Sequence, residues 1–564
     1  MTNKIKALLC LIRAKKNWWQ LFLYLAIMVF ITPSVFTLNS KALYIIYALA
    51  IYLIVVFIID LHKQVGLAAI NPCELGFYKF FICLLLFSIM LLLLTRLIPF
   101  IRYGETPLGY DTGFYLRDFR GFHDTTKVYG PFYLILMPLV NAGMSALATL
   151  NFVYILSQGL IAGSLYFFFR SLKIKNSFTF AVIAVFLFVV SITQFQAYWW
   201  MLAQQLLSMS LLILSIAFIF RNSLLFILTG AAGLMIHPPT FIILFFSMFI
   251  VFLFCLARSI INRQAVDKKI LFTAIVGTVA CGIFIYIRFD YFYSIFQTYI
   301  IQYKGLATNA LPYEIPKLLG SFIRTAAYQL NNYLLFPFAL IGILHVRLWK
   351  AFFPKQNHLA LLIYAALVGL LILTIFPFIY QQRFLIIFDI LLLIFATPII
   401  LILMKHFTND RTGKVIFMVF LIFFCVRLGF FVYNQKPQLT DAEFNEIKAT
   451  VQKIAPHSII LTTNSLYAPW LSGFSQSYVI SPGFNGDQWN LSEWIKFWNG
   501  HDDTLRYELL NELQRAYESY HFDALYVFIG DRENRGLPYE KFIKDKNPKF
   551  LKISPHFWQY QSTL

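Results

Sequence analysis

Two aspartates in one long polar segment have the residue type and spacing for acid–base chemistry. The segment runs IRYGETPLGYDTGFYLRDFRGFHDTTKVYGPFY from residue 101 and holds Asp111 and Asp118. If this stretch is helical, seven residues make two turns, so both carboxylates share a face about 10 Å apart. They are then too far apart to share a proton, but one of them can take a proton from an acceptor hydroxyl or orient it. The alternative is that the acids pair with Arg117 and Arg120 and only make the loop soluble.

Basic residues gather on the side of the chain that carries this segment. An anionic ligand would explain the excess, and Arg383, in YQQRF just before an apolar span, has the forked guanidinium that suits a phosphate at headgroup depth. For any single arginine the alternative is snorkelling to lipid phosphates. The basic residues expected on this side are Arg96, Arg102, Arg117, Arg120, Lys127, Arg288, Lys304, Lys317, Arg324 and Arg383.

Two further polar residues interrupt apolar stretches. His237, in MIHPPT, lies where two prolines break a span, and such a break predicts either a cavity or a structural kink. Asp389 lies inside a span, where we expect it to bond to a neighbouring helix rather than to react.

The sequence has no DxD, GxSxG, HExxH or Walker motif. It also has no CxxC or Cys/His ligand spacing, so we predict neither a disulfide nor a structural zinc.

The elements that must position these residues are apolar helices. Of the 564 residues, 59% are hydrophobic and only 13% charged, against about 25% charged in soluble domains. Uncharged runs of about 20 residues, which cross the hydrocarbon core as helices, recur along the chain. We therefore expect a polytopic α-helical membrane protein with about thirteen transmembrane helices. The expected spans are 21–36, 43–59, 80–100, 150–171, 178–199, 201–220, 224–240, 241–257, 270–288, 331–349, 359–380, 384–404 and 415–434.

The net charge of +20 is distributed as a membrane-orientation signal. Residues 1–435 hold 33 Lys and Arg against 11 Asp and Glu, whereas residues 436–564 hold 13 against 15. Because the excess lies between spans rather than in one patch, we predict no nucleic-acid partner. The short Lys- and Arg-rich loops place the N-terminus in the cytoplasm. An odd number of spans then puts the C-terminus and two long loops, 101–149 and 289–330, on the outer face.

Residues 436–564 predict a small α/β domain outside the cytoplasm, which leaves 1–435 as the transmembrane domain. Helical AEFNEIKATVQKI is followed by the apolar SIILTT, the strand-like SYVISPG, the amphipathic TLRYELLNELQRAYESYH and then ALYVFIG. This alternation of helix and apolar strand favours a partly parallel sheet. The domain has no glycine-rich phosphate loop.

Four features together resemble the GT-C superfamily of integral-membrane glycosyltransferases, which use polyprenyl-phosphate-linked sugars. They are GYDTGFYLRDF in the first long outer loop with YGPFY after it, GLMIHPPTF in a mid-chain span, FIYQQRFL at the start of a late span, and a tail with SIILTTNSLYAPWLSGF, SYVISPG and DALYVFIGD. The loop follows the third expected span rather than the first, which implies an extra N-terminal hairpin. It also lacks the DxD-like acidic pair of the oligosaccharyltransferase branch, so a divalent metal has no motif to support it and we assign no metal ligands.

The resemblance implies roles for particular residues. An acidic residue of the first outer loop acts as the base or orients the reactants, and the match is Asp111, with Asp118 as a second catalytic candidate. Basic residues near outer helix ends hold the donor phosphate. Arg383 is the best position for this role, and Arg117, Arg324 and His237 are weaker ones.

We therefore expect an enzyme of the bacterial cytoplasmic membrane. It would transfer a hexose or pentose from a polyprenyl-phosphate donor, within the membrane lipids, to a glycan, lipid or protein acceptor at the outer face. One alternative is a polymerase or ligase of lipid-linked glycans, whose Arg-rich outer loops do not depend on a carboxylate base. A second is a transporter or flippase of anionic lipid-linked substrates, which predicts inverted repeats and charges at the bilayer midplane; the sequence shows neither.

Overall fold

The structure is a computed structural model of the whole chain. It describes residues 75–262, 335–344, 357–375, 381–408 and 411–561, apart from gaps at 107, 122–130, 173–175, 220, 463, 483–488, 490, 519–520 and 532–536, together with a few single positions between 268 and 286. The expected N-terminal hairpin and the expected loop 289–330, with Arg324, lie outside the described residues. The chain forms two compact units.

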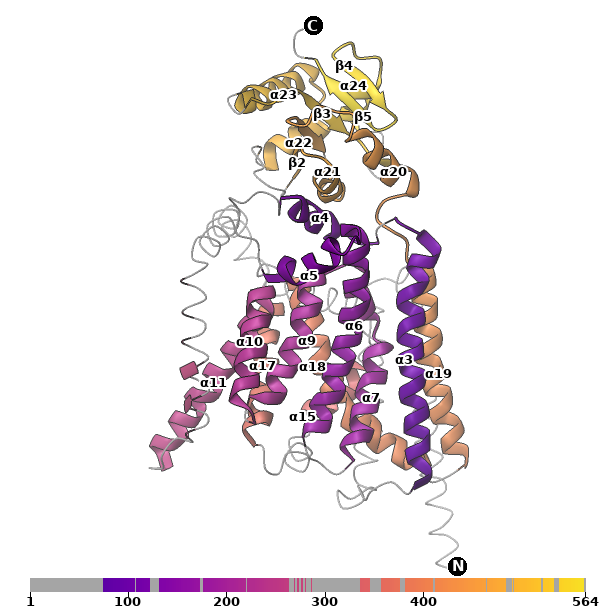
Figure 1. Ribbon diagram of the computed structural model, residues 1–564, viewed down its shortest axis with the longest axis vertical. Coiled ribbons are helices and arrows are strands. Elements are labelled where there is room, and N and C mark those ends of the chain that lie inside the picture. Colours follow the sequence, from indigo (N-terminus) through magenta and orange to yellow (C-terminus); the bar gives the residue numbers. More distant parts are fainter. Residues whose placement is uncertain are drawn as a thin grey trace, which may run out of the picture. The chain divides into compact units, whose positions relative to one another are not determined.

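The first unit is a bundle of apolar helices (Figure 1). It contains residues 157–197 and 204–431 and the first part of α3. Each expected span that falls on described residues coincides with a helix or a pair of helices. The helices are α3 (Leu75–Tyr103), α6 (Ala146–Ser171), α7 (Ser177–Val189), α8 (Ile192–Trp199), α9 (Ala203–Phe218), α10 (Ser223–Ile236), α11 (Pro238–Asn262), α15 (Phe336–Leu344), α17 (Asn357–Ile375), α18 (Gln381–Thr408) and α19 (Arg411–Asn434).

Four of the described helices are long and apolar enough to cross a membrane: Tyr78–Tyr103, Ala146–Ser171, Pro238–Ile261 and Arg383–Leu401. The pair α7 and α8, bent by 54°, forms a fifth if it counts as one span. The chain is therefore a multi-pass membrane protein. The expected total of about thirteen spans stays a prediction, because several of them lie outside the described residues.

Helix α18 is the centre of this bundle. It packs against α7, α15 and α17, and every residue of the apolar stretch 384–401 is buried. A helix that is apolar all round needs partners on every side, and α18 has them. Gly342 of α15 allows close approach, since a Cβ there would collide with the carbonyl oxygen of Phe395 in α18.

The second unit comprises residues 94–156, 198–203 and 432–564. Its first part holds α4 (Thr112–Gly121) and α5 (Pro131–Asn141), both inside the segment that the sequence treats as an outer loop. The ends of α3 and α19 are joined here, because Arg102 donates to the Tyr433 carbonyl (2.5 Å) and the Tyr103 hydroxyl donates to the Gln435 carbonyl (2.6 Å).

The C-terminal part of this unit, residues 436–561, is called the tail below and is built on a five-stranded sheet. The strand order is β2-β1-β3-β5-β4. Strands β1, β2 and β3 are parallel and β4 and β5 are antiparallel to their neighbours, so the sheet is partly parallel, as the alternation predicts. The strands are β1 (Ile459–Thr462), β2 (Tyr478–Ile480), β3 (Leu525–Phe528), β4 (Phe550–Ser554) and β5 (Phe557–Tyr560), and the helices are α20 (Asp441–Thr450), α21 (Ala468–Phe474), α22 (Leu491–Asn499), α23 (Asp503–Glu518) and α24 (Pro538–Lys544).

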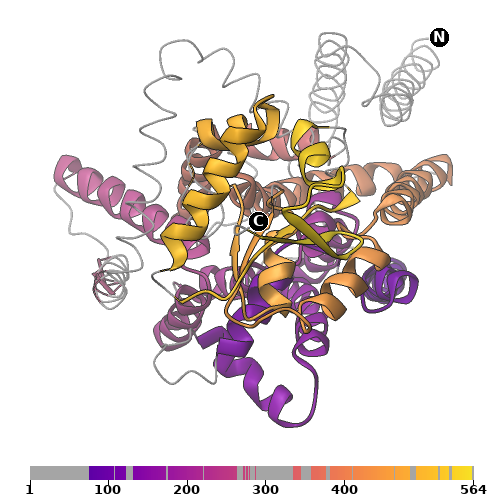
Figure 2. The same ribbon diagram turned by 90° about the horizontal axis from the view of Figure 1, so that it is seen from above.

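Helix α23 lies along the sheet (Figures 1 and 2) and buries one apolar stripe against it. Leu509, Leu510 and Leu513 recur at the helical spacing and join one core with strand residues such as Ile459 and Val527. Burying such side chains contributes about 1.5–3 kcal/mol each relative to leaving them exposed. The expected boundary between domains 1–435 and 436–564 stays a prediction.

Candidate functional site

Asp111 lies at the first turn of a short helix in the second unit. The Tyr115 amide donates to the Asp111 carbonyl (3.2 Å), which makes Asp111 the N-cap of α4, a position that aspartate favours. Tyr115, Leu116 and Phe119 are the buried face of the helix. Asp111 itself is only 7% exposed, which is unusual for a carboxylate.

The motif GYDTG fits closely around neighbouring backbone. A Cβ at Gly109 would overlap the backbone of Trp199 and Trp200, so only glycine allows the approach to the turn after α8. The buried Thr112 hydroxyl lies 3.0 Å from the Tyr154 hydroxyl and donates to the Met201 sulfur at 2.8 Å. These contacts hold α4 against α6 and the Trp199–Met201 turn.

The Met201 turn is itself an uncommon backbone conformation. Met201 has a φ of 58°, in the left-handed region that a side chain rarely occupies, and it is fully buried. Its amide donates to the Tyr198 carbonyl (2.9 Å) and its carbonyl accepts from Ala203 (2.9 Å). Residues held in such conformations need support from their surroundings and cluster at functional sites.

Asp118 occupies a different environment from Asp111. Its Oδ1 atom pairs with the Arg117 guanidinium at 3.2 Å, and its Oδ2 atom accepts from the Tyr133 hydroxyl of α5 at 2.6 Å. Burial raises the pKa of Tyr133, and the adjacent Asp118 carboxylate raises it further. This phenol therefore stays protonated and donates permanently. The pair that the alternative interpretation predicts, Asp118 with Arg117, is present, and Arg117 also lies over the Phe114 ring at 5.4 Å.

His237 and Arg383 are brought together in the first unit. Arg383 begins the apolar part of α18 and is half-buried, and it interacts electrostatically with the buried His237. His237 ends α10, and its Nδ1 lies 2.7 Å from the Thr240 hydroxyl. The Gly233 and His237 carbonyls accept from Ser208 at 2.9 and 3.4 Å. Protein groups therefore satisfy the backbone carbonyls at the break, as a structural kink requires, and the binding role expected of His237 stays a prediction.

Asp389 bonds to a neighbouring helix, as the sequence predicts. Its Oδ2 atom accepts from the hydroxyl of Ser191, the residue before α8 (2.8 Å), and from the side-chain amide of Gln194 in α8 (2.9 Å). These two donors, at the start of α8 and just before it, compensate for the burial of the carboxylate in the bundle.

Thr112, Tyr154 and Met201, which surround the start of α4, were not expected from the sequence, and Arg96 was expected only as one of the basic residues on this side. Arg96 is fully buried, lies 5.5 Å from the Tyr198 ring centre and donates to the Thr95 hydroxyl (3.0 Å). The one available signal was an arginine inside the apolar run LLLLTRLIPF, since such a residue needs a stated partner. The other three are ordinary in type: Thr112 follows Asp111 directly in the chain, and only the fold brings Tyr154 and Met201 near it.

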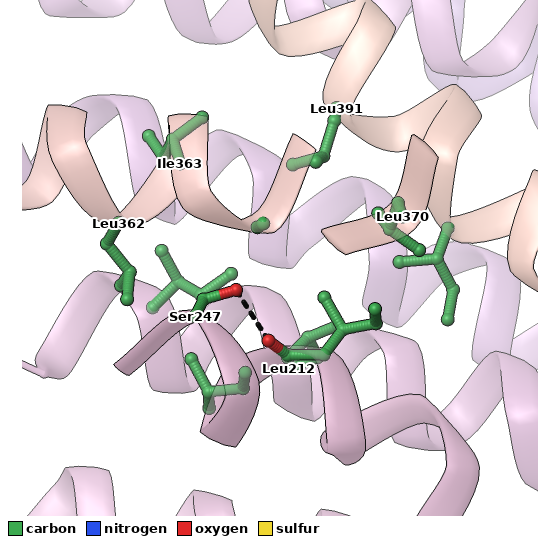
Figure 3. A pocket seen from close by; sticks show the side chains of 11 residues that line it. Leu212, Ser247, Leu362, Ile363, Leu370 and Leu391 are labelled. Carbon is green, nitrogen blue, oxygen red and sulfur yellow. Dashed lines mark hydrogen bonds between the residues drawn. The ribbon is translucent and has the colours of Figure 1, made fainter. Parts of the chain in front are cut away.

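The first unit also contains a small apolar cavity between α9, α11, α17 and α18 (Figure 3). Its volume is about 20 Å³, which is room for one water-sized group. Leu212, Leu362, Ile363 and Leu391 point into it, and the Ser247 hydroxyl instead donates to the Ile243 carbonyl at 2.5 Å. The cavity is a packing gap and not a sugar site.

Across the described part of the chain, no group of three or more His, Cys, Asp or Glu side chains is arranged to hold a metal ion.

Comparison with solved structures identifies a similar fold. The chain superimposes on the crystal structure of the oligosaccharyltransferase of Archaeoglobus fulgidus in complex with Zn and sulfate, with a TM-score of 0.50 and 13% identity, over 85% of this chain and 73% of that one. The two chains share a fold. ArnT from Cupriavidus metallidurans, bound to undecaprenyl phosphate, matches with a TM-score of 0.48 and 9% identity, over 86% of this chain and 98% of that one. No protein-family model and no curated protein matches the sequence.

Proposed function

We propose that this protein is a glycosyltransferase that moves a hexose or pentose from a polyprenyl-phosphate donor to an acceptor at the outer face of the bacterial cytoplasmic membrane. The observation that carries the proposal is Asp111, a buried carboxylate at the start of α4, where its carbonyl accepts from Tyr115 and the neighbouring Thr112 hydroxyl contacts Tyr154. The oligosaccharyltransferase-like fold supports it.

The proposed reaction is a direct displacement at the anomeric carbon. Asp111 takes the proton of the acceptor hydroxyl or amine as the new bond to the sugar forms. The bond from that carbon to the phosphate oxygen breaks, and polyprenyl phosphate leaves with both electrons, so the configuration inverts. Phosphate is a good leaving group, so the enzyme mainly has to align the reactants and neutralise charge.

The residues proposed to hold the donor phosphate are Arg383 first, then His237, which interacts with Arg383 electrostatically, with Arg117 and Arg324 as weaker positions. Asp118 is kept as a second candidate, although its bonds to Tyr133 and Arg117 favour a role in holding α4 on α5. The tail and the loops that carry these residues are proposed to lie outside the cytoplasm, with the N-terminus inside.

The test is transfer of radiolabelled sugar from a panel of polyprenyl-phosphate sugars by the purified protein in lipid nanodiscs. Labelled product and released polyprenyl phosphate in equal amounts, with inverted configuration, would support the proposal. Net movement of intact donor between leaflets without sugar transfer would instead establish the transporter alternative.

A further inference from the structure

Helix α21 of the tail touches the helix that carries Asp111. We propose that α21 sets the position of the Asp111 carboxylate through a backbone contact at Gly113 and Gly473, which makes these glycines positioning residues. The proposal rests on the proposed function, because it assumes that Asp111 is the base.

The contact requires glycine on both helices. A Cβ at Gly113 would overlap the Pro469 carbonyl, and a Cβ at Gly473 would lie 2.7 Å from the Gly113 carbonyl oxygen. Pro469 and Gly473 are four residues apart, so they lie on one face of α21. Gly113 therefore rests between them, and two backbones meet with no side chain in between.

Helix α21 is held in place by buried contacts within the tail. Trp470 and Leu471 are fully buried, and the Trp470 ring packs on Phe444 of α20. Just before the helix the Tyr467 hydroxyl donates to the Glu443 carboxylate at 2.7 Å, and the Tyr467 ring packs so closely on Gly530 that a Cβ there would overlap it.

Asp111 is two residues from each of two such contacts. Gly109 fixes the chain before it against Trp199 and Trp200, and Gly113 fixes the chain after it against α21. Carbon and oxygen atoms normally approach to about 3.5 Å, so a methyl group on Gly473 moves α4 by about 1 Å. A displacement of that size at a reacting group lowers the rate by about 100-fold.

The experiment compares Gly473→Ala with Gly500→Ala in the full-length protein in nanodiscs. Gly500 is a matched control, because a Cβ there also collides with backbone, at the Lys496 carbonyl, but in a part of the tail that does not touch α4. Two readouts are recorded for each variant: amide hydrogen exchange in residues 112–121, and kcat and KM for sugar transfer.

We expect exchange in α4 to rise at least about tenfold and kcat to fall by about 10- to 100-fold in Gly473→Ala, with KM for the donor within twofold of wild type. In Gly500→Ala, exchange in α4 and kcat should stay at the wild-type values. Unchanged exchange in α4 of Gly473→Ala would overturn the proposal, as would faster exchange with unchanged kcat. If the wild type transfers no sugar, the proposed function fails, and the positioning of a base fails with it even where the exchange result confirms the contact.

Discussion

The buried carboxylate of Glu443 is the point where three parts of the tail meet. Its Oε2 atom accepts from the Thr440 amide (2.8 Å), and the Glu443 amide donates back to the Thr440 hydroxyl (3.2 Å), which forms the capping box of α20. The Thr440 hydroxyl also donates to Oε2 (2.9 Å). The Glu443 Oε1 atom accepts from the Tyr467 hydroxyl (2.7 Å) before α21 and from the Asp531 amide (2.9 Å) after β3. We predict that Glu443→Gln lowers the free energy of unfolding of the tail.

The size of this loss of stability follows from the groups that donate hydrogen bonds to the Glu443 carboxylate. Glutamine has one oxygen, which would keep the bonds from Tyr467 and Asp531, and its amide nitrogen would then face Thr440. The Thr440 hydroxyl can rotate to accept, but the backbone amide loses a charged acceptor, which costs about 1.5–3 kcal/mol. The two remaining bonds lose their charge assistance. We expect the free energy of unfolding of the tail to fall by about 3 kcal/mol in total.

Hydrogen exchange of the β1 and β3 amides measures this directly. A loss of about 3 kcal/mol speeds exchange by roughly 100-fold in amides that open with the tail. Glu508→Gln, on the exposed face of α23, is the control and should leave these rates unchanged. Exchange in Glu443→Gln within threefold of wild type would refute the network as a source of stability.

Two further predictions concern α5 and the tail. Tyr133→Phe removes the 2.6 Å bond to Asp118 and should speed exchange in α5 by about tenfold, since a bond to a charged group contributes about 1.5–3 kcal/mol; an unchanged rate would contradict the proposed link of α4 to α5. The His556 imidazole bonds to Glu446 at 2.5 Å and to Asp531 at 3.0 Å. The hydrogen bond to Glu446 has the largest effect and raises the pKa of His556. Burial lowers this pKa in part, the bond to Asp531 raises it again, and the result is a pKa of about 9. A raised pKa stabilises the fold below the unfolded pKa, so tail stability should fall by about 1 kcal/mol between pH 6.5 and 9 after allowance for solvent screening; chemical unfolding of His556→Gln should lack that pH dependence.

The helices were predictable wherever an apolar run decides the structure locally. The stretches that became α6 and α18 are long, continuous and mostly apolar, so lipid leaves them one conformation. The break between α7 and α8 was not predictable, because 178–199 contains no proline or glycine. There Ser191 and Gln194 bond to Asp389, almost 200 positions away in the chain.

The candidate site also has parts that could be predicted from the sequence and parts that could not. Asp111 could be identified as a candidate, because an acid near apolar spans needs a reason. The flanking glycines of GYDTG could not be interpreted, since their need arises from Trp200 and Pro469, residues distant in sequence. Helix α5, with Tyr133, was expected to be part of a loop. Asp118 was grouped with Asp111 by its helical spacing, and only the fold reveals its bond to Tyr133.

Replacement of Asp111 tests the central claim most directly. Asn favours the N-cap position as much as Asp, so Asp111→Asn keeps α4 in place and removes the base. With donor binding measured separately on the same protein, we predict that the dissociation constant of the polyprenyl-phosphate sugar stays within about threefold of wild type while kcat falls by about 10²- to 10⁴-fold. Wild-type kcat in Asp111→Asn would contradict the account, and sugar transfer, if present, would then proceed without a carboxylate base at this position.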